Sequence, residues 1–455
     1  MLNFNKSPYT EINSNSVPNT MVFETFKVIS SILIVSVTLS ENNGRAITPI
    51  QGWRSWNQFQ GAISQDIMQS AMIALSSKSR LVDGIPTSFA DLGYNDAGID
   101  DNWQDCSGGT GGYTYHDAIT GRPAVNTQTF PNMTAMVDFA HSLNLTAGFY
   151  SNNCICHDHC SDPICFSGDV DQILDWGFDS VKLDGCGKEE NIELWNSLFN
   201  WTIQQRGLKN GMLLENCHNG PNTPQRGPTP AEDWCPFHMY RASTDIAPVY
   251  GSILANLQTI IPLAAQNLSY PSCWAYTDML EVGVTNKQNM PSVLSFVESR
   301  THFNAWCIIS SPLILGLNLS DTETVDSIWP IVSNKEAIAV NQEYAGFSGT
   351  IFYSSTEQTQ FAPCGWWLAN CSFPSFQYLY KPLPAGDTAV LLINSGDSTV
   401  NLTLNFTSVP GLSATTTYSL RDITNQVNLG SFSNTFTANN VGSRDSVFLR
   451  FSLTT

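Results

Sequence analysis

The feature that most constrains the fold is a repeated pattern along the middle of the chain. A short apolar run ends in polar or charged residues, and a stretch with helical spacing follows it. We count eight such runs, at residues 47–57, 92–103, 145–153, 178–185, 211–220, 238–246, 270–280 and 303–316. This alternation predicts an α/β fold of the (β/α)8 TIM-barrel type. The active site of such a barrel lies where the strands end, at the C-terminal face.

A second kind of sequence follows the repeats, which stop near Gly346. From about Gln377 the composition shifts to Thr, Ser, Val and Leu, and AVLLINSG, VNLTLNFT, TTYSLRD and SVFLRFS read as short antiparallel strands. We therefore predict a C-terminal antiparallel β-sandwich after the barrel. The expected division is an N-terminal segment with a signal peptide at 1–46, the barrel at 47–346, an irregular linker at 347–376 and the sandwich at 377–455.

Charge excludes one large class of partners. The chain has 20 Lys and Arg against 39 Asp and Glu, a formal net charge of −19. Such a surface repels the phosphates of nucleic acids and anionic membranes, so we expect no nucleic-acid partner. The apolar run at 28–39 is too short to span a bilayer and fits a secretory signal, with Met21 as the working start or the segment as a signal anchor. After cleavage we expect no stable membrane insertion.

Glycosylation signals and cysteines also favour secretion. Asn-x-Ser/Thr sequons occur at Asn132, Asn144, Asn200, Asn267, Asn318, Asn370, Asn401 and Asn405. The twelve cysteines form an even set, which in an oxidising compartment indicates disulfides. We expect a secreted, extracellular protein or one delivered to a lysosome or vacuole.

One cysteine cluster has two interpretations. It consists of Cys154, Cys156, His157, His159, Cys160 and Cys165. Thiolates and imidazoles are zinc ligands, but the paired CxxC modules of structural zinc sites are missing, so we favour a loop closed by disulfides. On the same argument we expect Cys364 and Cys371 to close a small loop.

Carboxylates close several of the apolar runs. They are Asp100, Asp101, Asp184, Asp245 and Asp278. Hydrolysis of a glycosidic bond needs two carboxyl groups, one as nucleophile or base and one as proton donor, although any barrel offers several Asp residues at its loops. Lys182 precedes Asp184 by two residues, so both side chains share one face of the strand, where a nearby ammonium would keep the carboxylate ionised. Arg241 precedes Asp245 by four residues and can hold sugar hydroxyls or the carboxylate.

These residues lie in motifs that resemble a known family. The motifs are GWRSWN (52–57), DDNW (100–103), GFYSN (148–152), KLDGC (182–186), RASTDI (241–246), WAYTDMLEVG (274–283), FNAWCIISSPLILG (303–316) and NKEAIAVNQ (334–342). Their order and spacing resemble the melibiase-type α-galactosidases, retaining glycoside hydrolases of family 27 with a barrel followed by a β-sandwich. The resemblance covers about residues 48–346 strongly and 377–455 loosely.

The resemblance implies a role for each matching position. Asp184 matches the nucleophile and Asp245 the acid/base, and Asp100 and Asp101 match the clamp on the galactose 4- and 6-hydroxyls. Further substrate-binding positions are Trp53, Tyr150, Lys182, Arg241 and Asp278. Cys186 matches a cysteine bridged to the loop after GFYSN, which makes Cys154, Cys156 or Cys160 its expected partner.

One departure bears on substrate selectivity. The family commonly has C-E-W-G after the fifth strand, in a loop that faces the sugar 2-position, and this chain has Cys217, His218, Asn219 and Gly220 there. We therefore add His218 to the substrate-binding positions. The alternatives within the family are an α-N-acetylgalactosaminidase and a β-L-arabinopyranosidase, although His218 does not obviously make room for an N-acetyl group.

The expected function is hydrolysis of terminal α-D-galactosyl residues by double displacement, with an oligosaccharide or glycoconjugate as the substrate partner. We expect no cofactor and no metal in the reaction, because a carboxylic acid protonates the leaving group. An inactive carbohydrate-binding protein is the alternative from another class. It would be expected to have lost Asp184 or Asp245, and both are present.

Overall fold

The computed structural model describes residues 43–151, 155–217, 223–229, 232–285, 294–365 and 369–454. The predicted signal peptide, Cys154 and His218 lie outside these ranges. Among the helices within them, none has both the length and the apolar character needed to cross a membrane.

The first half of the fold is the predicted barrel. Within the described residues, eight parallel strands form one sheet in the order β10-β1-β4-β5-β6-β7-β8-β9. They are β1 (Gln51–Arg54), β4 (Asp96–Gly98), β5 (Thr146–Ser151), β6 (Ser180–Asp184), β7 (Leu213–Cys217), β8 (Met239–Arg241), β9 (Trp274–Tyr276) and β10 (Leu313–Leu315). Beyond β9, a parallel bridge from Leu280 to Leu315 of β10 joins the two ends of the sheet. The predicted TIM barrel is confirmed.

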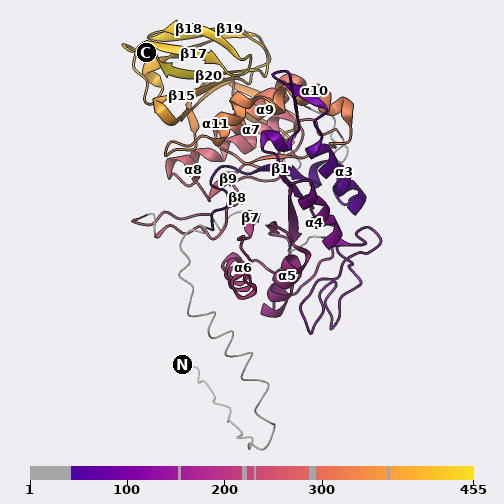
Figure 1. The fold of residues 1–455 in the computed structure, drawn as a ribbon. Coiled ribbons are helices and arrows are strands. Elements are labelled where there is room, and N and C mark those ends of the chain that lie inside the picture. The colour runs from indigo at the N-terminus through magenta and orange to yellow at the C-terminus, as the bar shows by residue number, and fades with distance from the viewer. Residues whose placement is uncertain are drawn as a thin grey trace, which may run out of the picture. The chain divides into compact units, whose positions relative to one another are not determined.

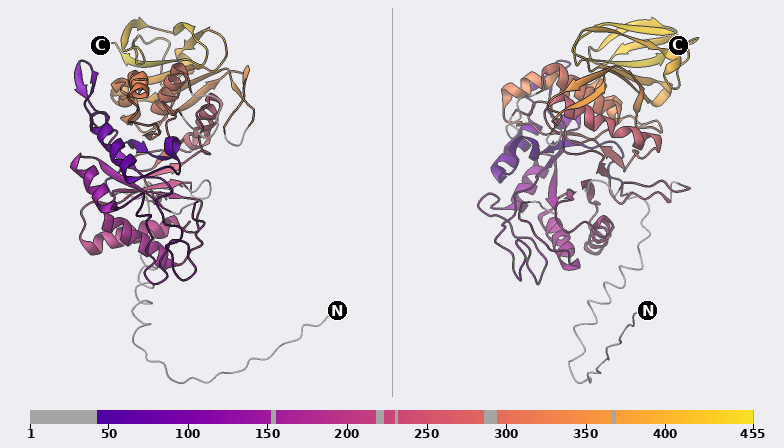
Figure 2. Two further views of the ribbon diagram at one scale, coloured as in Figure 1. Left: turned by 90° about the vertical axis from the view of Figure 1, so that its right-hand side faces the viewer. Right: turned by 180° about the vertical axis from the view of Figure 1, so that it is seen from behind.

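Helices alternate with these strands and surround them (Figures 1 and 2). They are α2 (Trp56–Phe59), α3 (Gln65–Ser76), α4 (Met133–Ser142), α5 (Pro163–Trp176), α6 (Ile192–Arg206), α7 (Tyr250–Gln258), α8 (Ile260–Ala265), α9 (Phe296–Ile308), α10 (Thr322–Val332) and α11 (Lys335–Gln342). Local chemistry sets their ends. Asn132 caps α4 by accepting the Ala135 N–H, and α6 ends at Gly207, which adopts the left-handed conformation with φ of 63°.

The second half is an antiparallel β-structure. A six-stranded sheet has the order β11-β14-β15-β20-β17-β18, and β16 pairs with β19. These strands are β11 (Thr350–Ser354), β14 (Phe376–Pro382), β15 (Thr388–Asn394), β16 (Val400–Asn405), β17 (Tyr418–Asp422), β18 (Val427–Phe432), β19 (Thr435–Val441) and β20 (Ser446–Leu453). Each of the four predicted strand segments overlaps β15, β16, β17 or β20.

Strand β15 is buried along its whole length, and its position explains why. Val390 and Leu392 lie in the core shared with β16 and β19. Their neighbours Leu391 and Ile393 point to the opposite face of the sheet, and β15 also contacts helix α9. One face of the sheet therefore packs in the core of the β-structure, and the other face packs against the barrel helices.

The segment 347–376, which we predicted to be irregular, contains three strands. β11 joins the edge of the large sheet, and β12 (Gln358–Phe361) pairs with β13 (Cys371–Pro374). These strands are too short for their alternation to be recognised from sequence, and they depend on pairing with β14 or with each other. The Cys364–Cys371 disulfide closes the loop between β12 and β13, as predicted.

Further disulfides shape the catalytic end of the barrel. Cys106 pairs with Cys156, and Cys160 pairs with Cys165, so the predicted closure of this loop by disulfides is confirmed. Cys186 is also disulfide-bonded. Two of its three expected partners, Cys156 and Cys160, are in other bridges, and the third lies outside the described residues.

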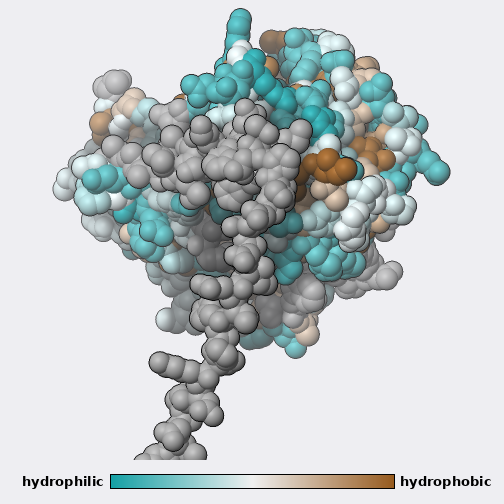
Figure 3. All heavy atoms as spheres, turned by 90° about the horizontal axis from the view of Figure 1, so that it is seen from below, coloured by the Kyte–Doolittle hydropathy of each residue, from teal (hydrophilic) through white to brown (hydrophobic). Residues whose placement is uncertain are grey.

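Much of the surface seen from below is hydrophilic, with apolar side chains in separate places (Figure 3). This agrees with the excess of acidic residues in the sequence.

Candidate active site

The predicted site residues gather at the C-terminal ends of the barrel strands. Asp184 and Arg241 are the last residues of β6 and β8, and Tyr150 lies one residue before the end of β5. Asp100, Asp101, Asp245 and Asp278 follow β4, β8 and β9 within a few residues. Parallel strands end at one rim of a barrel, so residues far apart in sequence meet there.

The Asp184 carboxylate is oriented by two donors. The Tyr150 hydroxyl donates to Oδ2 at 2.7 Å, and the Gly185 N–H donates to Oδ1 at 2.7 Å. Burial, followed by the charges of Asp184, Asp101 and Asp100, raises the pKa of Tyr150 well above its usual value. Tyr150 therefore stays a neutral donor throughout the physiological range. Asp184 itself is half-buried, which leaves it accessible from the mouth of the barrel.

Lys182 pairs most closely with Asp100. Its ammonium donates to Asp100 Oδ2 at 2.8 Å and lies 5.3 Å from the centre of the Tyr150 ring. Burial lowers the pKa of Lys182, but the nearby acidic groups, Asp100 foremost, outweigh burial, and the pKa lies well above its usual value. The ammonium that we expected beside Asp184 is therefore present, with Asp100 as its main partner. β5 lies between β4 and β6 in the sheet, so Lys182, two residues before Asp184, reaches across β5 to the segment that follows β4.

Backbone contacts hold the two acidic residues after β4. Asp100 donates its N–H to Ser55 Oγ, and its Oδ1 accepts the Asp101 N–H. Asp101 Oδ2 accepts the N–H of Ile155 at 3.2 Å, which links this segment to the loop after β5. Both carboxylates are almost completely buried, at 2% and 1% exposure.

A second charged group lies across the rim. Arg241 Nη2 is 2.9 Å from Asp245 Oδ1 and 2.9 Å from Asp278 Oδ2. The Asp245 side chain is 63% exposed, whereas that of Asp278 is 4% exposed. Burial lowers the pKa of Arg241, but the nearby anions, Asp278 foremost, raise it well above its usual value. The guanidinium thus joins a buried carboxylate to a solvent-exposed one.

Asp278 also holds the backbone around this group. Its Oδ2 accepts the Ile246 N–H at 2.8 Å, and its Oδ1 accepts the Met279 N–H at 2.8 Å. Ile246 directly follows Asp245, so Asp278 fixes both the arginine and the segment that carries Asp245.

Cys217 lies between the residues around Asp184 and the residues around Arg241. It is the β-ladder partner of Asp184, and Arg241 Nη1 donates to its Sγ at 3.5 Å. Burial, followed by the charge of Asp184, raises the pKa of the thiol well above its usual value. Cys217 of β7 therefore contacts Arg241 and lies beside Asp184, between the two charged groups. His218, the next residue, lies outside the described part of the chain.

Sequence analysis missed a charged network deeper in the barrel. Arg54 Nη2 is 2.6 Å from Asp96 Oδ2 and 3.8 Å from Glu215 Oε2. Burial raises the pKa of Glu215, against the opposing charges of Arg54 and Lys182. A signal was present, because Asp96 and Glu215 are acidic residues within short apolar strands. Glu215 lies two residues before Cys217 in β7, so the two side chains share one strand face.

Three tryptophans of the barrel pack in its interior. Trp53 is fully buried, and its indole N–H donates to the Leu317 carbonyl at 2.8 Å. Trp103 and Trp274 are also fully buried, with indole N–H groups bonded to the carbonyls of Tyr150 and Ala46. The structure therefore brings together the predicted charged residues and Tyr150, and it places these tryptophans in the core.

Comparison with known proteins places the chain in a family. The family model described as "Alpha galactosidase A" matches residues 48–343, and the one described as "Alpha galactosidase C-terminal beta sandwich domain" matches residues 374–451. The chain belongs to the alpha galactosidase A family. It is therefore a glycoside hydrolase, and the resemblance seen in the sequence motifs is confirmed.

Individual relatives agree at lower identity. The chain is 25% identical over 419 residues to a probable alpha-galactosidase of Dictyostelium discoideum, covering 90% of this chain and 94% of that one. It is 26% identical to a probable alpha-galactosidase D of Aspergillus niger, of which it spans about half the length, 54%, while 85% of this chain is covered. The crystal structure of alpha-galactosidase I from Mortierella vinacea has the same fold, with a TM-score of 0.71 and 22% identity over 91% of this chain and 99% of that one.

Proposed function

We propose that this member of the family hydrolyses terminal α-D-galactosyl residues with retention of configuration. Asp184 is the nucleophile and Asp245 the acid/base. The observation that carries the assignment is the contrast between the two carboxylates at one rim. Asp184 is oriented by two donors, and Asp245 is exposed and held by Arg241.

In the first step an Asp184 oxygen forms a bond to the anomeric carbon as the bond from that carbon to the leaving oxygen breaks. Asp245 gives its proton to the leaving oxygen. A carboxylate oxygen has two lone pairs, so a hydrogen-bond donor can orient it without blocking attack. In the second step Asp245 takes a proton from water, whose oxygen bonds to the anomeric carbon and releases Asp184. The exposure of Asp245 suits a group that exchanges protons with water.

The remaining residues bind the sugar or position the catalytic carboxylates. We assign Asp100 and Asp101 to the galactose hydroxyls, with Lys182 balancing the charge of Asp100. Arg241 positions Asp245, and Asp278 positions Arg241. Trp53 is as deeply buried as Asp100 and Asp101, and its contact with the sugar stays a prediction.

The test is release of p-nitrophenol from the α-galactoside across about pH 4 to 7, with Asp184→Asn as the blank. The α-N-acetylgalactosaminide and the β-L-arabinopyranoside are assayed in parallel. NMR of the first-formed sugar distinguishes retention from inversion. We expect turnover of the α-galactoside with retention. Turnover of none of the three would favour an inactive carbohydrate-binding protein.

We also propose that the protein works in an oxidising compartment, outside the cell or in a lysosome or vacuole. The disulfides within the described residues support this. N-terminal sequencing of the mature protein, together with glycosidase treatment, tests both signal cleavage and use of the sequons.

A further inference from the structure

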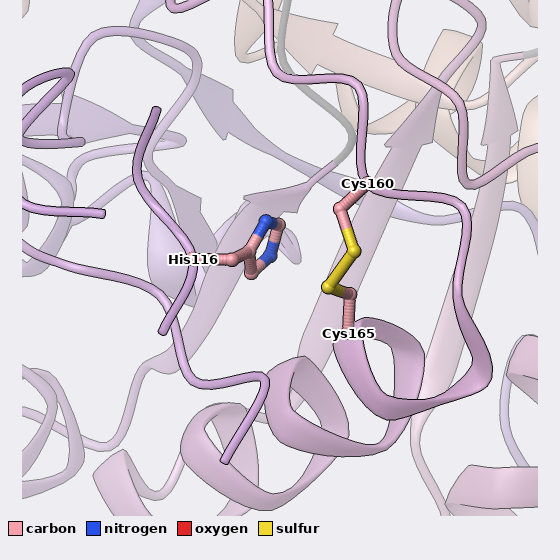
Figure 4. A group of neighbouring side chains, drawn as sticks. All are labelled: His116, Cys160 and Cys165. Atoms are coloured by element: carbon pink, nitrogen blue, oxygen red, sulfur yellow. A yellow bond between two sulfur atoms is a disulfide. The ribbon is translucent and has the colours of Figure 1, made fainter. Parts of the chain in front are cut away.

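A second polar cluster lies among the loops of the same barrel end, and the proposed reaction does not use it. It consists of His116 in the loop after β4, Asp158 in the loop after β5, Asp169 in helix α5 and Glu189 in the loop after β6. All four residues are buried, with exposures of 1%, 8%, 1% and 2%. Figure 4 shows the His116 imidazole beside the Cys160–Cys165 disulfide.

The imidazole has a different partner at each nitrogen. Asp158 Oδ2 is 2.7 Å from Nδ1, and both carboxylate oxygens of Asp169 are 3.2 Å from Nε2. Glu189 hydrogen-bonds to Asp169. One ligand atom each from His116, Asp169 and Glu189 lie within 4.8 Å of one another.

Neighbouring structure fixes these positions. Asp158 accepts the N–H groups of His159 and Cys160, and the Glu189 carbonyl accepts the Trp195 indole N–H. The segment after His116 also touches α5 directly. A Cβ at Gly168 would lie only 2.1 Å from the Gly121 carbonyl carbon, so only glycine permits this approach.

We propose that His116 Nε2, Asp169 and Glu189 form a site for one tetrahedral Zn²⁺ ion whose fourth ligand is water, with Asp158 orienting the imidazole through Nδ1. A carboxylate on the far nitrogen of a metal-binding histidine is a recurring arrangement, because it sets the tautomer and the ring orientation. Ligand atoms around a tetrahedral ion at about 2.0–2.1 Å lie roughly 3.3 Å apart. The 3.2 Å separation of His116 Nε2 from Asp169 matches that edge.

Charge gives a second reason. Asp158, Asp169 and Glu189 place three buried carboxyl groups around one imidazole. Buried charges in proteins are either paired or bound to a metal ion.

The donor set selects the class of metal. Imidazole nitrogen with carboxylate oxygens suits Zn²⁺, whereas Mg²⁺ and Ca²⁺ prefer oxygen ligands alone. Cys160 and Cys165 are in a disulfide and so do not compete as thiolates. The site differs from the cysteine and histidine cluster considered in the sequence, whose His157 and His159 are exposed. A bound ion would connect the loops after β4 and β6 with helix α5.

The test uses the full-length, untagged protein with its disulfides intact, stripped with a chelator and titrated with ZnCl2 by calorimetry. We expect about one Zn²⁺ per chain and a higher Tm. MgCl2 should give neither of these. Neither readout depends on α-galactosidase activity, so failure of the proposed reaction leaves this test intact.

Glu189→Gln is the decisive variant, because glutamine keeps the size of the glutamate side chain but provides no carboxylate ligand. Its zinc affinity should fall by at least about tenfold relative to the parent. His159→Gln changes an exposed histidine in the loop after β5, next to Asp158, and should bind zinc like the parent. Absence of binding to the parent up to about 1 mM, or equal affinity in Glu189→Gln, would overturn the proposal.

Discussion

Tyr150 of β5 donates a 2.7 Å hydrogen bond to Asp184 of β6. The two residues are on neighbouring parallel strands, and the register places Tyr150 opposite Lys182, two residues before Asp184. The hydroxyl therefore reaches diagonally to the end of the next strand. This contact makes the tyrosine a positioning residue for the proposed nucleophile, and it can be removed without changing the shape of the side chain.

We expect Tyr150→Phe to lower kcat/KM for the α-galactoside by about 10- to 100-fold. A hydrogen bond to a charged group contributes roughly 1.5–3 kcal/mol, and here the group is the proposed nucleophile. Tyr240→Phe is the matched control, because this buried hydroxyl donates to the Leu268 carbonyl, away from the carboxylates. Steady-state kinetics provides the comparison. Equal losses of kcat/KM in both variants would contradict a specific role of Tyr150.

Asp245→Asn should lower kcat by at least about 100-fold for substrates with a poor leaving group, because the proton donor is lost. Its side chain is 63% exposed, so the variant should fold with an unchanged Tm. Asp326→Asn alters another exposed aspartate, 66% exposed and paired with Arg80, and should keep full activity. A smaller loss for activated aryl galactosides than for oligosaccharides would identify the group as the acid. Near-normal turnover of raffinose by Asp245→Asn would refute the assignment.

Lys182→Met should lower the free energy of unfolding by about 3–5 kcal/mol, since it leaves the Asp100 carboxylate buried without its cation. The two side chains are 9% and 3% exposed. Lys335→Met breaks an ion pair of similar length, 2.9 Å to Asp83, in which the side chains are 49% and 63% exposed. We expect that change to cost less than about 1 kcal/mol. Urea unfolding of both variants measures the difference, and equal values would contradict the buried pairing.

Acid should destabilise the fold through His238. Burial, followed by the charge of Arg45, lowers its pKa to about 3 in the folded protein, while an unfolded histidine titrates near 6.5. Between these values the unfolded chain binds the extra proton, so this stability is present above about pH 6.5 and is lost as the pH falls toward 3. His238 Nδ1 accepts the Leu214 N–H, and asparagine can supply the same acceptor.

When the pH is lowered from 6.5 to about 4.5, the free energy of unfolding should therefore fall in both proteins. The fall should be about 2–3 kcal/mol smaller in His238→Asn than in the parent. His159→Asn, at an exposed site, should follow the parent. Urea titrations at the two pH values provide the comparison. Parallel losses in parent and His238→Asn would show that this histidine does not contribute to the acid sensitivity.

Local sequence determined much of this protein. Strand runs that end in polar residues predicted the barrel, and motif spacing placed Asp184 and Asp245 at strand ends. The same kind of pattern predicted the strand at Thr388–Asn394. These features depend on residues close together in the chain, because side-chain period and strand ends are set locally.

Tertiary structure decided which side chains meet. Strand order made Asp100 the main partner of Lys182, and barrel closure buried Trp53 and joined Arg54 to Asp96 and Glu215. The cluster around His116 combines loops after three different strands, so no spacing in the sequence predicts it. A buried charge is stable only beside its counter-charge, and that counter-charge comes from residues brought close by folding.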